Sequence, residues 1–124
     1  MEIKANNSLV INKRIDLGAL YPEMLFLLLR VTPIMEYDNE GKRTDKVVAY
    51  AYECVETKDF THLKVRVDSL ELPITNEELQ KLREEGEKVA VEFINPTIMA
   101  YINRTTNTIE DSIRADAVRL VEME

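Results

Sequence analysis

Residues 75–86 of this 124-residue chain read Thr-Asn-Glu-Glu-Leu-Gln-Lys-Leu-Arg-Glu-Glu-Gly, and this stretch decides the predicted fold. Thr75 and Glu78 have the Ser/Thr-x-x-Glu spacing of a capping box, which satisfies free N–H groups at the start of a helix. Leu79 and Leu82 share one helical face, and Gly86 supplies a C-terminal stop. The pattern therefore predicts one short, capped helix in the second half of the chain.

Extended apolar runs lie on both sides of this helix. Three runs precede it and two follow it, and the last two are each interrupted, by Pro96 and by a slip of the apolar phase between Ala115 and Val118. The predicted strands cover residues 24–37, 47–56, 62–67, 88–93 resuming at 97–102, and 112–121. Three strands, one helix and two strands are the element order of a mainly β, five-stranded OB-like Greek-key barrel. Such barrels commonly bind oligonucleotides or oligosaccharides on strands 2 and 3 and the loops 1–2 and 4–5.

The chain length is that of one domain. We expect a single OB-like domain over residues 24–124. Residues 1–23 are predicted to form a lead-in segment, because Gly18 and Pro22 argue against a regular element there.

Composition and charge restrict the class of protein. Hydrophobic residues make up 45% of the chain and charged residues 31%, as in soluble globular proteins. The longest apolar stretch, 24–31, is far shorter than the roughly 20 residues that cross a bilayer, and no signal peptide is evident, so we expect a cytoplasmic protein without membrane contact. The net charge of −7 opposes simple binding to a phosphate backbone, but residues 68–92 alone hold eight acidic and three basic side chains. The first three strands and the 4–5 loop are neutral to slightly basic.

Catalytic and metal-binding patterns are missing from the sequence. His62 and Cys54 are the only residues of their types, and three scattered glycines form no phosphate-binding loop. Cys54 lies in a strand and is expected to be a buried thiol. Residues 38–41 lack the acidic spacing of a calcium loop, and we interpret them as an exposed hairpin tip. The sequence predicts a non-enzymatic protein without a cofactor.

The candidate functional surface combines aromatic side chains, on which bases stack, with cations that follow phosphates. In the strand 47–56, Tyr50 and Tyr52 share one face, and in the next strand Lys64 and Arg66 alternate with apolar residues. Two alternatives remain open: the tyrosines face the core with their hydroxyls at its edge, and the cations form an ordinary solvated face. The predicted nucleic-acid-binding residues are Tyr50, Tyr52, His62, Lys64, Arg66, Lys42, Arg43, Lys46, Tyr101 and Arg104.

Three stretches, 37–45, 91–96 and 113–120, together resemble the YdcP-like family of small proteins carried by integrative and conjugative elements of Gram-positive bacteria. The sequences are Tyr-Asp-Asn-Glu-Gly-Lys-Arg-Thr-Asp, Val-Glu-Phe-Ile-Asn-Pro and Ile-Arg-Ala-Asp-Ala-Val-Arg-Leu. The resemblance implies an accessory factor that helps a host helicase unwind DNA nicked by the element's relaxase. It carries over no catalytic residue. Members tend to begin with a Phe-Gly-x-Leu segment, where this chain has Leu-Gly-Ala-Leu at 17–20.

The expected function is therefore non-enzymatic assistance to DNA processing or replication of a mobile element. The expected partners are single-stranded DNA and, by resemblance, a host helicase or relaxase, and a homo-oligomer is left open. Two alternatives are a protein-binding module that uses the charged helix face or a strand edge, and a phage or plasmid structural component.

Overall fold

The computed structural model describes residues 9–23 and 25–122 as a mainly β protein with one α-helix. The predicted helix is confirmed at α1 (Asn76–Glu84). The elements before it are β1 (Arg14–Asp16), the 3₁₀ turn η1 (Leu17–Ala19), β2 (Phe26–Tyr37), β3 (Arg43–Glu56) and β4 (His62–Val67). After it come β5 (Ala90–Ile94), β6 (Thr97–Asn103), β7 (Thr108–Ala115) and β8 (Ala117–Val121).

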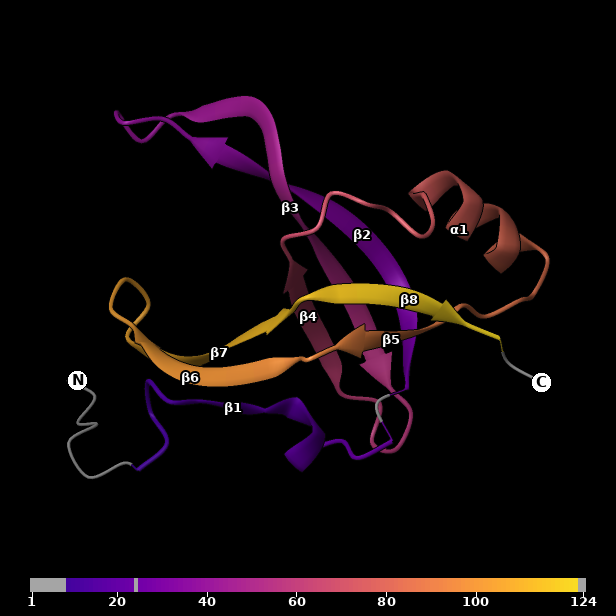
Figure 1. The fold of residues 1–124 in the computed structure, drawn as a ribbon, viewed down its shortest axis with the longest axis horizontal. Coiled ribbons are helices and arrows are strands. Elements are labelled where there is room, and N and C mark those ends of the chain that lie inside the picture. Colours follow the sequence, from indigo (N-terminus) through magenta and orange to yellow (C-terminus); the bar gives the residue numbers. More distant parts are fainter. Residues whose placement is uncertain (1–8, 24, 123–124) are drawn as a thin grey trace.

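The eight strands of the described residues form one mixed sheet in the order β1-β6-β7-β4-β3-β2-β5-β8 (Figure 1). The pairs are antiparallel except for β4 and β7, which run parallel. The sheet is open, with β1 and β8 at its ends. The mainly β class with one helix is confirmed, whereas the predicted five-stranded OB-like barrel differs from this open sheet of eight strands in the described residues.

Two bends account for most of the difference in strand count. Asn95 and Pro96 separate β5 from β6, and Asp116 separates β7 from β8. Pro96 cannot donate to the ladder, and Asn95 has a positive φ of 51°, which asparagine tolerates better than most residues. β5 pairs with β8 and β6 with β7, so the two bends lie side by side. Both bends fall where the sequence predicts irregularity: at Pro96, and in the slip of the apolar phase between Ala115 and Val118, where Asp116 lies.

The third difference lies in the segment before β2. β1 pairs with β6, and Leu17 in η1 is completely buried, although no regular element was expected there. Asp16 accepts a hydrogen bond from the backbone N–H of Gly18 at 3.0 Å and so begins the turn. The predicted start of the first strand at residue 24 lies outside the described residues, and β2 begins at Phe26.

The helix lies against β2 and satisfies part of its backbone. The capping box is present, with the Glu78 N–H 3.2 Å from Thr75 Oγ1 and the Thr75 N–H 3.3 Å from Glu78 Oε1. Asn76 bonds both the N–H and the C=O of Val31 on β2, at 2.9 and 2.7 Å. The Asn76 side chain thereby makes the two hydrogen bonds that the backbone of a neighbouring strand would make to Val31. Pro33 follows on β2 and offers no N–H to another chain.

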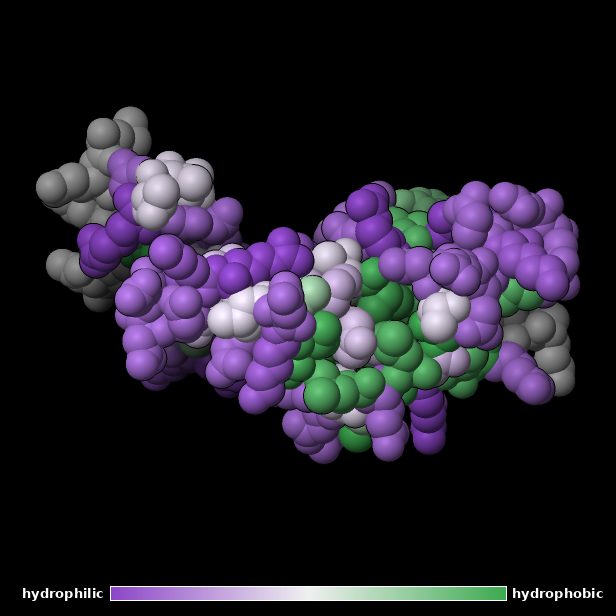
Figure 2. All heavy atoms as spheres, turned by 90° about the horizontal axis from the view of Figure 1, so that it is seen from above, coloured by the Kyte–Doolittle hydropathy of each residue, from purple (hydrophilic) through white to green (hydrophobic). Residues whose placement is uncertain are grey.

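The hydrophobic core is formed by inward side chains of β2 to β7, together with Leu17 of η1, Ile74 and Leu79 of the helix. Phe93 contacts two aromatic rings there, with centroid distances of 5.6 Å to Phe26 and 6.2 Å to Tyr52. In Figure 2, hydrophobic side chains also reach the middle of one face, between the hydrophilic ends of the molecule. No helix within the described residues is long and apolar enough to span a membrane.

Candidate nucleic-acid interface

Two arginines lie side by side on the outward face of the sheet. Arg66 of β4 is the register partner of Arg114 on the parallel strand β7, and neighbouring strands are about 4.8 Å apart. The flanking residues Val65, Val67 and Ile113 are buried, so alternation directs both arginines outward. Because like charges on adjacent strands repel, this pair is suited to an anion that bridges both guanidinium groups.

A third guanidinium joins them from β1. Arg14 donates from Nη1 to Thr97 Oγ1 at 3.0 Å and from Nη2 to Ser112 Oγ at 3.0 Å. Thr97 is the register partner of Arg114, and Ser112 lies two residues before Arg114 on the same face of β7. These bonds hold Arg14 beside the arginine pair. We call Arg14, Lys64, Arg66 and Arg114 the arginine face.

Few carboxylates neutralise this face. Arg66 forms an ion pair with Asp68, with Nε 2.9 Å from Oδ1. Among the described residues, Arg114 forms no ion pair. Glu53, the register partner of Lys64, lies 3.0 Å from Arg30 Nε on its other side. The face therefore keeps positive charge available despite the acidic composition of the chain.

The two predicted loops project from the same end of the molecule (Figure 1). In the β2–β3 hairpin, Lys42 and Lys46 form long, exposed ion pairs with Glu40 and Glu36, at 3.9 and 3.8 Å. Such surface pairs contribute little stability and exchange readily for other anions. Arg43 and, in the β6–β7 turn, Arg104 are exposed and form no ion pair within the described part of the chain.

The predicted stacking role of Tyr52 is wrong. Tyr52 is completely buried and packs edge-on against Phe93, and its hydroxyl has no hydrogen-bond partner among the described residues. Burial of the side chain and, as the smaller effect, electrostatic repulsion from the nearby Tyr50 raise the pKa of Tyr52 to about 12. Tyr50 shares this inner face and is half-buried against the core. The alternative that these tyrosines face inward is the observed one.

The remaining predicted residues are more accessible. His62 and Lys64 are exposed on the outward side of β4. Tyr101 is half-buried, with its hydroxyl 3.4 Å from Glu110 Oε2. Cys54 is fully buried, as predicted, and burial raises the pKa of its thiol to about 12.

Two aromatic side chains that the sequence analysis missed are exposed. Tyr37 at the hairpin base is 66% exposed and Phe60 in the β3–β4 turn is 68% exposed. Both lie next to polar turn sequences, and this position indicates exposure to solvent. Arg114 was also missed, although its alternation with Ile113 and Ala115 indicated an outward position.

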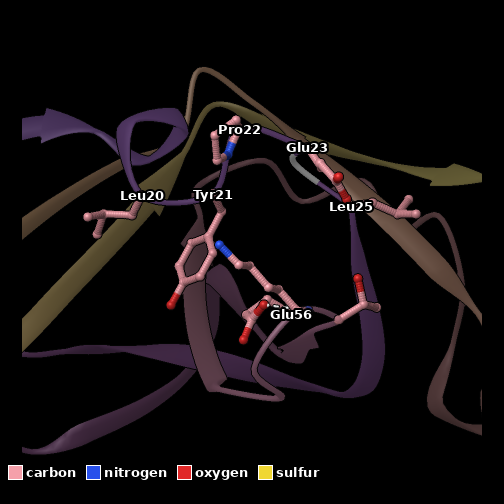
Figure 3. A pocket seen from close by; sticks show the side chains of 8 residues that line it. Leu20, Tyr21, Pro22, Glu23, Leu25 and Glu56 are labelled. Carbon is pink, nitrogen blue, oxygen red and sulfur yellow. Dashed lines mark hydrogen bonds between the residues drawn. The ribbon is translucent and has the colours of Figure 1, made fainter.

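A cavity of about 470 Å³ lies between the segment after η1 and the β3–β4 turn. Tyr21 and Glu56 lie in the middle of it, and Leu20 and Leu25 at its two sides (Figure 3). Both Glu56 carboxylate oxygens accept hydrogen bonds from the turn backbone, so this group has little capacity for a ligand. In the described ranges, no cluster of three or more His, Cys, Asp or Glu side chains could hold a metal ion.

Comparisons of the chain with protein-family profiles, curated proteins and solved structures find no match.

Proposed function

We propose that this protein is a non-enzymatic accessory factor that binds single-stranded DNA through the arginine face. The observation that carries the proposal is the outward pairing of Arg66 with Arg114, with Arg14 held beside them. Guanidinium groups bind phosphate bidentately, so Arg66 and Arg114 can hold a phosphate between them, while the charge of Arg14 adds to the positive potential beside them. The hairpin and β6–β7 cations extend the positive surface at one end.

An OB-like architecture supports this proposal. β5 and β6 can be counted as one bent strand, and β7 and β8 as another. In that count, β2 pairs with the β5–β6 strand and β4 pairs with the β7–β8 strand. The helix then lies between the third and fourth strands, which is OB-like order. The arginine face draws most of its residues from the third and fifth of these strands, adjacent to the usual OB ligand surface.

The acidic total charge favours a single strand over a duplex. A duplex offers mainly phosphates, and its non-specific binding depends on excess positive charge, which this chain lacks. A single strand also offers base faces to exposed aromatic side chains. Together with the resemblance to the YdcP-like family, this supports a cytoplasmic role in processing the DNA of a mobile element.

The test is fluorescence anisotropy with a labelled thirty-base single strand and the matching duplex, at low and moderate salt. We expect a salt-dependent preference for the single strand. The double variant Arg66→Ala/Arg114→Ala should bind more weakly, and its slope of log K against log salt should be shallower by about 1.4, since each single-strand phosphate contact contributes about 0.7.

The matched control is Lys81→Ala/Lys88→Ala, which removes the same charge from the acidic helix segment. Its binding and salt slope should stay close to those of the wild type. Equal losses of affinity in both double variants would mean that binding depends on net charge alone and would contradict the proposal. Absent binding at low salt would reject the proposal.

A second candidate is a protein-binding role with the helicase or relaxase as partner. The edge strand β8 carries the exposed Leu120, and its neighbour β5 carries the exposed Ile94. An unpaired edge with apolar side chains can accept an added strand. This candidate predicts DNA binding that is absent or insensitive to salt.

A further inference from the structure

The β3–β4 turn presents an aromatic side chain on a strained backbone. Phe60 has a φ of +59°, in the left-handed region that bulky residues rarely occupy, and its side chain is 68% exposed. No core packing compensates for this conformation, because the ring lies largely in solvent. Strain of this kind clusters at binding sites and persists only where the surroundings impose it.

Glu56 imposes the conformation. This residue is 2% exposed, and its carboxylate accepts hydrogen bonds from the backbone N–H groups of Lys58, Asp59 and Thr61 at 2.8, 2.8 and 2.9 Å. The Glu56 N–H also donates to the Thr61 C=O at 3.0 Å. These bonds enclose Phe60 on both sides in sequence. These bonds fix the turn backbone that carries the exposed ring, so little backbone entropy is lost on binding.

The turn leads directly into the cationic side of β4. His62, Lys64 and Arg66 follow Phe60 at alternate positions, and Arg66 lies beside Arg114. Six residue steps separate Phe60 from Arg66 and span at most about 20 Å, because the chain is extended from His62 onward. Aromatic rings combined with a cationic track are the features of single-strand-binding surfaces, whose sites cover about 4–16 nucleotides per OB fold.

We propose that Phe60 is the base-stacking residue of this protein, positioned by Glu56 to stack on a nucleobase whose strand continues along Lys64 to the arginine face. The inference rests on the proposed function. The charge of the adjoining track identifies the occupant as a base of a single-stranded nucleic acid. Phe60 takes the role that the sequence analysis assigned to the buried Tyr52.

The first test is Phe60→Gly. Glycine adopts positive φ without strain, so this variant should fold with an unchanged or higher Tm, and any lost binding is not caused by unfolding. We expect at least about fivefold weaker binding to the thirty-base single strand, with an unchanged salt slope, because stacking involves no counterion release. Leu70→Ala, which truncates an exposed apolar side chain elsewhere, is the control and should bind like the wild type.

The second test separates stacking from phosphate contact. A strand of the same length that lacks bases keeps every phosphate, so the wild type and Phe60→Gly should bind it with equal affinity. That affinity should match the affinity of Phe60→Gly for the normal strand. The chain contains no tryptophan, so Phe60→Trp introduces a single reporter, whose fluorescence should be quenched as bases stack on it.

The outcomes are distinguishable. If Phe60→Gly binds the normal strand as the wild type does, or if the tryptophan fluorescence of Phe60→Trp is unchanged at saturation, the stacking role is overturned while the proposed function stands. If the wild type binds no single strand at low salt, both fail. Capture of a protein partner that depends on Phe60 without DNA binding would overturn the stacking role and reassign the turn to protein recognition.

Discussion

Asn95 Nδ2 donates a hydrogen bond to Asp116 Oδ2 at 3.0 Å and joins the two bends of the sheet. The Asp116 N–H also donates to the Ile94 C=O at 2.9 Å. Asn95 and Pro96 lie in the stretch 91–96, and Asp116 lies in the stretch 113–120. Those stretches therefore have an architectural role, since they set the positions of β6 and β7 in the sheet that carries the arginine face.

The bend itself can be tested with two substitutions of Asn95. Asn95→Gly keeps the positive φ and loses the bond to Asp116, whereas Asn95→Ala loses both. We expect Asn95→Gly to lower the free energy of unfolding by about 1 kcal/mol and Asn95→Ala by about 2 kcal/mol, measured by urea denaturation. Equal losses would show that the backbone conformation contributes nothing.

Tyr52 supplies a test of the core. Its buried hydroxyl has no hydrogen-bond partner in residues 9–23 and 25–122, so Tyr52→Phe removes an unsatisfied group without a change of shape. We expect the free energy of unfolding to stay equal or to rise by about 1 kcal/mol, and DNA affinity to stay unchanged. A loss above about 1 kcal/mol would mean that the hydroxyl is hydrogen-bonded, for example to a buried water.

Glu56 predicts a pH dependence of stability. Its pKa is lowered, chiefly by the hydrogen bond from the Thr61 backbone and then by those from Asp59 and Lys58. A lowered pKa in the folded state stabilises the fold above the pKa of a free glutamate, about 4.3, and this stabilisation is lost as the pH falls through the folded value. Glu56→Gln should therefore lower Tm measurably at pH 7.

The Tm difference between Glu56→Gln and the wild type should be constant from about pH 7 to pH 5 and should shrink below about pH 4. The exposed Glu71→Gln is the control and should show a small difference at every pH. A difference for Glu56→Gln that does not change with pH would exclude ionisation of Glu56 as its source.

Asp68 competes with phosphate for Arg66. Their ion pair, at 2.9 Å, is exposed, and such pairs are worth about 0.2–1 kcal/mol. Asp68→Asn should therefore raise single-strand affinity about two- to fivefold at low salt, as measured by anisotropy. Glu71→Gln has the same change in net charge and should have a smaller effect. Equal gains in both variants would mean that Asp68 acts only through net charge.

The capped helix and the outward row of β4 could be predicted from sequence, because their determinants are local. The Thr75 and Glu78 side chains bond within one helical turn, and Lys64 and Arg66 alternate with the buried Val65 and Val67. Pro96 likewise marks an interruption wherever it occurs in a strand. Such patterns are readable without knowledge of any distant contact.

The faces of β3 were decided only by the tertiary structure. Both of its faces are apolar, with Tyr52 and Cys54 on one side and Ala49 and Ala51 on the other, so periodicity does not distinguish them. Pairing of Tyr52 with Val65 places the tyrosines on the same side as the inward row of β4. The stacking prediction failed for this reason, since the alternation within β3 contains no information about its neighbours.

The arginine face depends on pairing between segments that are distant in sequence. Arg114 reaches Arg66 through the parallel pairing of β7 with β4, and Arg14 arrives from a segment with no recognisable strand pattern. Phe60 acquires its strained, exposed position from the bonds of Glu56 across the turn. The helix, the strand-rich class and the alternation along single strands could be read from the sequence, because they follow from neighbouring residues. Which side chains share a surface was decided by strand order and register, because each strand presents two faces and only its partners select one.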